Sequence, residues 1–474
     1  MLRLTVRRKP LTLAIILKIK IYFQIMKQIL IFFLLPIAAF GQNSISNNLE
    51  RYMQAQVEIN GFGGTVLVMK NDTVLLKKAY GLADYEWNIP NTIDTKFGLA
   101  SITKHFTAIA ILQLVEKGKL SLNDKLNKFF PDYPKGDSVT IHMLLTHTSG
   151  LGLDFDELYM DHTAMSKDSA LTIIKKKLYL FAPGTSCKYS NIGYFLLSEI
   201  IEKSSGESYA GYLRKYIFDI ADMKNTGVSN NDSIIFSKAR IYYRTDKGFV
   251  HNPYMNWNLC IGLDGLYSTV EDLYKLDRAL YGESLLSETS KLKMTTQHNK
   301  KYLNDGFFET YGYGIFINPY YNHKHYLLTH SGGFNGVMTS FDRFTDDNVF
   351  IAVLSNNQSE SHMISYGLSG IVFNIPVELP YKHKAITIDT TLYNNYAGKY
   401  GKIEIIKMNG RLFWNTSDTE LLPESETKFF RADNNDRTIE FVANKQKTVT
   451  SLILTKGGVK EIILKDKQGK STNR

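Results

Sequence analysis

The chain has 474 residues, of which 44% are hydrophobic and 22% are charged, a length and composition that favour two globular domains with sizeable cores. Residues 1–41 contain seven of the 56 Lys and Arg residues and no Asp or Glu, so the rest of the chain has 49 basic and 46 acidic residues and a net charge of +3. This nearly balanced charge gives no electrostatic basis for nucleic-acid binding, which we do not expect.

Residues 1–41 are predicted to be an upstream extension followed by a signal peptide. From Met26, the sequence MKQILIFFLLPIAAFGQ has a lysine, an apolar core at 29–40 and small residues before Gln42, which are the three parts of a secretory signal. We expect cleavage after Gly41 and a periplasmic or secreted protein. An uncleaved anchor is the alternative, but lysines interrupt the run of about 20 apolar residues that a membrane span needs, so no stable span is expected after cleavage.

Residues 42–375 are predicted to form one α+β domain. Strand-like sequence lies near its start, in GGTVLVMKNDTVLLKKAYG, and near its end, in YLLTHSGG, MTSFDRF and NVFIAVLSN, with helical runs between. The last two of these strands flank Thr-Asp-Asp-Asn, which is typical of a hairpin turn. This order predicts an antiparallel sheet built from both ends of the domain, with flanking helices and an inserted helical region.

The stretch GLASITKHFTAIAILQLVEKG places Ser101 three residues before Lys104. It predicts an amphipathic helix with Ser101 as its N-cap, because serine hydroxyls accept hydrogen bonds from first-turn amides. The apolar residues of the predicted face are Phe106, Ile109, Leu112 and Val115. At this spacing the two polar side chains share a helix face, where a buried lysine can serve as base for a nucleophilic serine. The spacing alone is a weak signal, since it occurs twice more in the chain.

Two later motifs supply the other groups that such a serine needs. Tyr189–Asn191 lies between a Pro-Gly turn and a predicted helix, and offers a second polar group for proton transfer. His330–Gly333 ends a predicted strand, where glycines allow close approach to the backbone and leave amides free for a developing oxyanion. His147 is expected to be structural. Asp264 and Tyr267 are expected to shape the wall of the cleft, with contact to the substrate left open.

The last part of the chain has a different pattern. Pro376 and Pro380 mark a predicted linker at 376–384. Short alternating strands follow, with the dipeptides Asn409-Gly410 and Gly457-Gly458 as hairpin turns. Residues 385–474 are therefore predicted to be a small all-β domain, barrel-like because closure removes exposed strand edges.

Several other kinds of site are disfavoured. The chain has no Gly-x-Ser-x-Gly elbow, no Gly-x-x-x-x-Gly-Lys phosphate loop, no His-Glu-x-x-His and no Cys/His ligand spacing. We therefore predict no metal site and no cofactor. The two cysteines, Cys187 and Cys260, exclude a disulfide scaffold but leave a single bridge open.

The ordered set Ser101-Ile-Thr-Lys104, Tyr189-Ser-Asn191 and His330-Ser-Gly332 resembles the penicillin-recognising serine hydrolase superfamily. Within it, the resemblance is to the group of class C β-lactamases, D-alanyl-D-alanine carboxypeptidases and esterases, over residues 48–375. The tail, with YAGKYG at 396–401, resembles the lipocalin-like domain often appended to these enzymes.

The resemblance implies that Ser101 is the acylated nucleophile and that Lys104 and Tyr189 share the general base and acid work. The implied oxyanion hole is formed by the backbone amides of Ser101 and Gly333. The implied substrate-binding residues are Asn191, His330, Ser331, Gly332 and Gly333.

One departure from the family pattern bears on the substrate. The third motif commonly reads Lys-Thr-Gly, whereas His330 stands here in place of the lysine. Histidine is mostly uncharged near neutral pH, which weakens the case for gripping a substrate carboxylate. We therefore expect an enzyme of D-amino-acid peptidase or esterase type, which hydrolyses a small ester, amide or peptide such as one derived from the cell wall. A β-lactamase or D-Ala-D-Ala carboxypeptidase, and a catalytically inactive peptide- or glycan-binding protein, are the alternatives.

Overall fold

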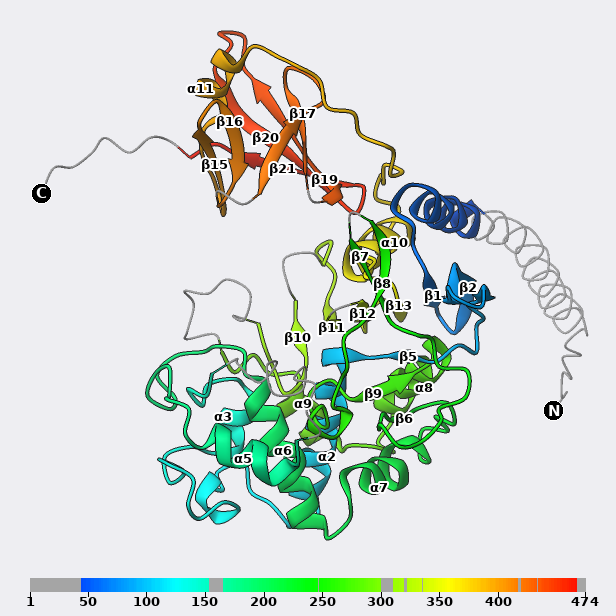
Figure 1. Cartoon of the computed structure of the whole chain (residues 1–474), viewed down its shortest axis with the longest axis vertical. Coiled ribbons are helices and arrows are strands. Elements are labelled where there is room, and N and C mark those ends of the chain that lie inside the picture. Colours follow the sequence, from blue (N-terminus) through cyan, green and yellow to red (C-terminus); the bar gives the residue numbers. More distant parts are fainter. Residues whose placement is uncertain are drawn as a thin grey trace, which may run out of the picture.

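A computed structural model describes residues 44–152, 165–245, 247–299, 310–318, 322–334, 336–416, 419–432 and 434–466. The predicted signal peptide and its cleavage point lie outside these ranges. Within them, no helix has both the length and the hydropathy needed to cross a membrane. Figure 1 shows an all-β unit beside a larger α+β unit, with α10 next to the contact between them.

The larger unit is built on a six-stranded sheet with the order β10-β11-β12-β13-β1-β2, in which every neighbouring pair is antiparallel. Its strands are β1 (Gly64–Lys70), β2 (Thr73–Tyr80), β10 (Phe316–Ile317), β11 (Leu327–Phe334), β12 (Val337–Phe344) and β13 (Val349–Ser355). The pairing of β1 with β13 joins the start of the unit to its end. This confirms the predicted α+β fold with a sheet assembled from both ends.

The sheet is covered on both faces, which explains why β1 and β13 are almost entirely buried. Along β1, Leu67 and Met69 belong to the core on the side of the helical region, whereas Val66 and Val68 belong to a second core. The second core includes residues from the helix at 44–60 and from α10 (Ser361–Val372). Alternation of side chains along a strand produces this division.

The remaining helices lie mainly on the other face. They are α2 (Thr103–Glu116), α3 (Ile141–Leu145), α5 (Lys167–Ile174), α6 (Asn191–Ser205), α7 (Tyr209–Leu213), α8 (Val270–Tyr281) and α9 (Glu288–Met294), with a π-helical turn at Arg214–Phe218 and 3-10 turns at Ala100–Ile102 (η1), Leu126–Lys128 (η2) and Trp257–Leu259 (η4). Short strands complete this part: β3 (Leu82–Asp84), β4 (Ile89–Pro90), β5 (Phe97–Gly98), β6 (Gly227–Val228), β7 (Tyr242–Thr245), β8 (Gly248–His251) and β9 (Leu266–Ser268).

Helix α2 differs from the prediction in two ways. Every residue from Thr103 to Leu114 is buried, so the helix is not amphipathic. Its N-cap is Ile102 rather than Ser101, with no side-chain capping bond. The physical reason is that apolar and small residues occupy all faces of α2, which lets it run through the centre of the unit between its neighbours.

The all-β unit is an antiparallel meander of eight strands that closes almost completely into a barrel. Its elements are η6 (Thr390–Leu392), α11 (Tyr393–Tyr396), β14 (Gly398–Tyr400), β15 (Ile403–Met408), β16 (Arg411–Trp414), β17 (Glu420–Pro423), β18 (Lys428–Arg431), β19 (Asn434–Ala443), β20 (Val449–Lys456) and β21 (Val459–Leu464). The backbone amide of Asp466 donates to the Lys399 carbonyl at 2.8 Å, which links the last segment to the first strand. The barrel-like prediction is confirmed.

Both predicted hairpin turns of the barrel are present. Asn409 and Gly410 have φ values of +50° and +73°, and Gly457 and Gly458 have +53° and +81°. Positive φ at both central residues matches the right-handed twist of the paired strands. The β20–β21 hairpin also contacts the larger unit, because the Tyr52 hydroxyl donates to the Gly457 carbonyl at 3.1 Å.

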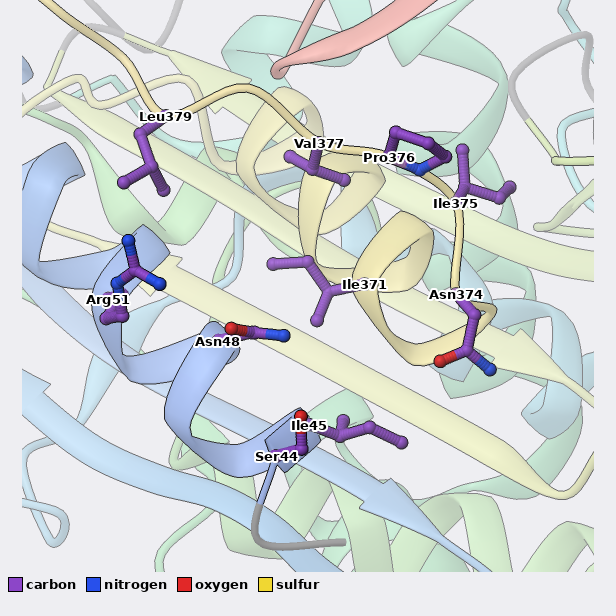
Figure 2. Close-up of a pocket in the computed structure, with 10 residues that line it drawn as sticks. All are labelled: Ser44, Ile45, Asn48, Arg51, Ile371, Asn374, Ile375, Pro376, Val377 and Leu379. Atoms are coloured by element: carbon purple, nitrogen blue, oxygen red, sulfur yellow. The ribbon is translucent and has the colours of Figure 1, made fainter. Parts of the chain in front are cut away.

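A cavity of about 620 Å³ lies where the helix at 44–60, the end of α10 and the segment 374–379 meet (Figure 2). Its lining residues are Ser44, Ile45, Asn48, Arg51, Ile371, Asn374, Ile375, Pro376, Val377 and Leu379. None of the predicted catalytic or substrate-binding residues lines it. The predicted linker begins in this region, and the Glu378 amide donates to the Gly458 carbonyl at 2.8 Å. The predicted domain boundaries themselves stay a prediction.

Candidate active site

Ser101 lies in the middle of η1, in a sharp turn held by two other elements. The preceding residue, Ala100, has a left-handed φ of +47°, which is costly for a residue with a Cβ atom. The Leu99 amide donates to the Leu266 carbonyl at 2.8 Å, and the Leu99 carbonyl accepts from Thr339 Oγ1 at 2.9 Å. These bonds fix the strained turn between β9 and β12. Local strain of this kind is common at functional sites.

The structure brings Ser101 and Lys104 together, as the motif predicts. Lys104 Nζ donates to Ser101 Oγ at 2.9 Å and to the Leu263 carbonyl at 3.0 Å. The lysine side chain is completely buried. Ser101 Oγ in turn donates to Asp264 Oδ1 at 2.9 Å, and the same carboxylate oxygen lies 3.6 Å from Lys104 Nζ.

Tyr189 is also part of this cluster. Its ring centroid lies 4.9 Å from Lys104 Nζ. The ring of His147 packs beside it, with centroids 4.3 Å apart and an interplanar angle of 32°. His147 Nδ1 accepts from the Ser190 amide at 3.0 Å. Burial, and secondarily the charge of Lys104, hold the pKa of His147 well below its usual range, so a neutral His147 packs against the Tyr189 ring and holds the Ser190 amide.

Asn191 is the first residue of α6 and is buried. The helix begins here because Ser190 is its N-cap, with Oγ accepting from the Gly193 amide at 3.1 Å. Ser190 Oγ also donates to the Gly152 carbonyl at 3.2 Å. The predicted order of turn, Tyr-Ser-Asn and helix is therefore present, and the cap fixes where Tyr189 and Asn191 lie.

His330 is buried among other side chains. Its Nε2 is 3.1 Å from the Tyr311 hydroxyl, and its Nδ1 is 2.7 Å from the Ser331 carbonyl. Burial, followed by the charge of Lys104, lowers the pKa of His330 to about 3. This direction agrees with the expectation that the histidine is uncharged near neutral pH. With only 1% of the residue exposed, its side chain offers no accessible edge to a substrate in this structure.

Gly332 and Gly333 differ in what surrounds them. A Cβ at Gly332 would lie 2.9 Å from the Ala100 Cβ and would overlap the Leu99 carbonyl oxygen. The glycine thus lets β11 pack against the turn that carries Ser101. Gly333 is exposed and Ser331 is half-buried, so the glycine whose amide is assigned to the oxyanion hole is open to solvent at the end of β11.

Asp264 lies closer to the proposed nucleophile than the sequence predicts. The sequence places it in the cleft wall, whereas its carboxylate contacts both Ser101 and Lys104. The sequence feature that could have indicated this contact is a carboxylate within the glycine-rich turn GLDG, directly before the strand β9. Tyr267, on that strand, pairs with Gly98 and packs over Gly227.

The described residues give little support for a disulfide or a metal site. Cys187 and Cys260 are buried and are not joined by a disulfide. In the part of the chain that the structure describes, no group of three or more His, Cys, Asp or Glu side chains is arranged to hold a metal ion. The cluster around Ser101 offers the serine hydroxyl, the Lys104 amine and the Asp264 carboxylate in mutual contact, with the Tyr189 ring against the amine.

Comparison with known proteins shows which family the chain belongs to. Residues 48–365 match the family model described as Beta-lactamase. The chain is 31% identical over 427 residues to penicillin-binding protein 4* of Bacillus subtilis strain 168, covering 81% of this chain and 92% of that protein. The chain belongs to the beta-lactamase family and has the fold of its serine hydrolases.

The solved structures that resemble the chain include a penicillin-binding protein homologue and a D-amino acid amidase. The octameric penicillin-binding protein homologue of Pyrococcus abyssi has a TM-score of 0.64 and 26% identity, covering 88% of this chain and 99% of that one. The D-amino acid amidase of Ochrobactrum anthropi SV3 has a TM-score of 0.59 and 23% identity, covering 70% of this chain and 96% of that one. The second likeness is one of fold alone.

Proposed function

We propose that the protein is an exported serine hydrolase that forms an acyl-enzyme on Ser101 and hydrolyses a small ester, amide or peptide. The observation that carries this proposal is the contact between Ser101 Oγ and the amine of the fully buried Lys104 at 2.9 Å. A lysine on the surface would be an ordinary solvated charge. Burying an amine beside a serine hydroxyl costs folding free energy, and buried ionisable groups of this kind are concentrated at functional sites.

The proposed reaction has two stages. Ser101 Oγ attacks the substrate carbonyl carbon, and the amides of Ser101 and Gly333 stabilise the oxyanion. The intermediate collapses with release of the amine or alcohol and leaves an ester on Ser101. A water molecule then attacks that ester, with Tyr189 as its activator, and regenerates the serine hydroxyl. Lys104 Nζ contacts Ser101 Oγ and lies 4.9 Å from the centroid of the Tyr189 ring, so these two residues are the proposed partners of the reacting oxygen in proton transfer and charge stabilisation.

The environment of His330 favours esters, amides and D-amino-acid peptides over β-lactams. A neutral, buried imidazole cannot supply the fixed positive charge that Lys-Thr-Gly enzymes direct at a carboxylate. The D-amino acid amidase of Ochrobactrum anthropi has the same fold, which supports amide hydrolysis within this range. β-Lactamase or D-Ala-D-Ala carboxypeptidase activity is therefore the second candidate function.

Export is proposed from the sequence of residues 1–41, with cleavage after Gly41 and activity in the periplasm or outside the cell. N-terminal sequencing of the protein from the extracytoplasmic fraction tests this. A mature chain that begins at Gln42 is expected, and full-length chain retained in the cytoplasm would contradict it.

Labelling tests the nucleophile. A fluorescent fluorophosphonate and a fluorescent penicillin should be applied to the wild type and to Ser101→Ala, with Ser290→Ala as the matched control because Ser290 also stands three residues before a lysine. Label is expected on the wild type and on the control and absent from Ser101→Ala. Equal labelling of all three would overturn the assignment of Ser101, and the absence of all labelling would favour a catalytically silent binding protein.

A substrate panel tests the proposed specificity. Turnover of p-nitrophenyl esters, D-amino-acid amides, D-Ala-D-Ala peptides and nitrocefin should be compared as kcat/KM. Ester or amide turnover is expected to exceed nitrocefin turnover. Efficient nitrocefin hydrolysis would show that a neutral His330 does not disfavour β-lactams.

A further inference from the structure

Asp264 is the second partner of the proposed nucleophile. It lies in the turn between η4 and β9, and its backbone amide donates to the Cys260 carbonyl at 2.9 Å. Only 2% of the residue is exposed. Its Oδ1 accepts a hydrogen bond from the Ser101 hydroxyl at 2.9 Å. The hydrogen in this bond is the proton that must leave when the serine attacks. A carboxylate in this position is both close enough and correctly directed to take that proton.

The surroundings of Lys104 favour its ammonium form. Its Nζ faces the Ser101 hydroxyl oxygen at 2.9 Å, the Leu263 carbonyl at 3.0 Å and the Asp264 carboxylate at 3.6 Å. All three are acceptors, which match the three donors of an ammonium group. The rings of Tyr189 and Tyr194 lie 4.9 and 5.8 Å away and add cation–π attraction. An ammonium group has no lone pair with which to accept a proton from Ser101.

We propose that Asp264, rather than Lys104, takes the proton of Ser101 during acylation, and that Lys104 stays positively charged and stabilises the developing alkoxide. The proposal rests on the function proposed for Ser101. It makes Asp264 a catalytic residue, because its oxygen contacts the reacting hydroxyl. Tyr189 keeps its proposed role in the later transfer to or from water.

Atoms and electrons balance in this step. The O–H bond of Ser101 breaks and its proton moves to Asp264 Oδ1, while the Oγ electron pair forms the bond to the substrate carbonyl carbon. The carbonyl π electrons move to the oxygen, which the two amides hold. When the carbonyl reforms, the bond to the leaving nitrogen or oxygen breaks, and the proton on Asp264 is available to that leaving group. Asp264 returns to its carboxylate form.

Four other titratable groups around this cluster do not compete for the proton. His147 and His330 are neutral near pH 7, because burial and the charge of Lys104 depress the pKa of each. Burial raises the pKa of Tyr194 and of Tyr311 above the usual value, so both phenols stay protonated.

The rate of Ser101 modification by a fluorophosphonate, measured from pH 4.5 to 9.5, tests the proposal because the two assignments predict opposite shifts for Asp264→Asn. If Asp264 is the acceptor, the rate at pH 7 falls by about 100-fold or more, and the acidic limb moves to higher pH. If Lys104 is the acceptor, the loss of a neighbouring anion disfavours its ammonium form, and the acidic limb moves to lower pH. A downward shift or an unchanged profile overturns the proposal.

Asp132→Asn is the matched control. It removes the same charge from an exposed carboxylate that pairs with Lys175 at 2.7 Å, and its profile is expected to match the wild type. Circular dichroism and melting curves check that each variant is folded. If Asp264→Asn does not fold, the wild-type profile decides: an acidic limb below about pH 6 fits a carboxylate acceptor, and one above about pH 8 fits an amine or phenol and overturns the proposal.

Labelling of Ser101 distinguishes failure of the proposed function from failure of the proposed role of Asp264. Absence of modification at Ser101 in the wild type overturns the proposed function and the role of Asp264 together. Modification of Ser101 with an unshifted Asp264→Asn profile overturns the role of Asp264 alone.

Discussion

Gly332 lies directly against the chain at Leu99, with no room between them for a side chain. A Cβ at Gly332 would lie 2.5 Å from Thr339 Oγ1 and would overlap the Leu99 carbonyl oxygen. The same carbonyl accepts the hydrogen bond from Thr339 that anchors the Ser101 turn. The glycine of the third motif therefore positions the proposed nucleophile, Ser101, through its backbone.

Gly332→Ala is expected to lower the free energy of unfolding by about 1–3 kcal/mol, because the neighbouring atoms belong to backbone and a short side chain that must shift. Displacement of Ser101 is expected to cost about 100-fold in kcat. Urea unfolding and ester turnover measure the two effects. Gly282→Ala is the control, since no heavy atom lies within 4 Å of its Cβ position. Equal effects of the two substitutions would contradict a positioning role for Gly332.

Stability is expected to fall as the pH drops below about 6.5. The pKa of folded His330 is lowered to about 3, so between pH 6.5 and 3 the unfolded chain binds a proton that the folded chain does not. Folding is therefore favoured at higher pH, by about 1.4 kcal/mol per pH unit for this histidine. Urea unfolding at pH 7, 6 and 5 measures the slope.

His330→Gln is expected to reduce that slope, because glutamine does not titrate. His251→Gln is the control for removal of a histidine, since the His251 side chain is 54% exposed and pairs with Glu86 at the surface, and the larger fall in slope is expected for His330→Gln. A slope in His330→Gln equal to that of the wild type would show that His330 does not contribute to the acid sensitivity.

His147 is expected to act on catalysis through Tyr189. The two rings pack 4.3 Å apart, and His147 holds the Ser190 amide. His147→Ala and Tyr189→Phe should each lower kcat by about 100-fold with little effect on KM. In the double variant the losses should not add, giving a coupling energy of about 1–3 kcal/mol. Steady-state kinetics of the four proteins in the cycle measure it.

The pair His142 and Tyr313 is the matched control for that cycle. It also brings a histidine ring against a tyrosine, with His142 Nδ1 2.8 Å from the Tyr313 hydroxyl, and neither residue is among the proposed catalytic or substrate-binding residues. His142→Ala and Tyr313→Phe are expected to change stability rather than kcat. Additive losses in kcat for His147 and Tyr189 would contradict the supporting role.

Much of the fold was predictable because it follows from local patterns. Alternation and turn chemistry indicate the β12–β13 hairpin and the barrel turns at Asn409-Gly410 and Gly457-Gly458. The burial of α2 on all faces was not predictable from its motif, because small residues such as Ala108 and Ala110 suit either a solvent face or a tightly packed core. Position in the fold decides between the two.

Part of the candidate site was predictable from the sequence, and part was not. Ser101 and Lys104 are three residues apart, so helical geometry alone places them together. Asp264 reaches Ser101 across 163 residues of sequence, and no local pattern encodes that contact. Likewise, the His-Ser-Gly motif indicates the charge of His330 but not its burial, which depends on Tyr311 and the packing of β11.

Ala100→Gly is expected to leave stability almost unchanged despite the loss of a buried methyl group. The left-handed conformation of Ala100 costs about 1–2 kcal/mol in an L-residue, and its relief offsets the lost methyl of about 0.8 kcal/mol and the added entropy of the unfolded chain. Ala108→Gly, in the middle of α2, has no strain to relieve and is expected to cost about 2 kcal/mol. Urea unfolding compares them. Because glycine allows more conformations beside Ser101, Ala100→Gly should still react more slowly with a fluorophosphonate. Equal destabilisation by the two substitutions would mean that the turn at Ala100 stores no strain.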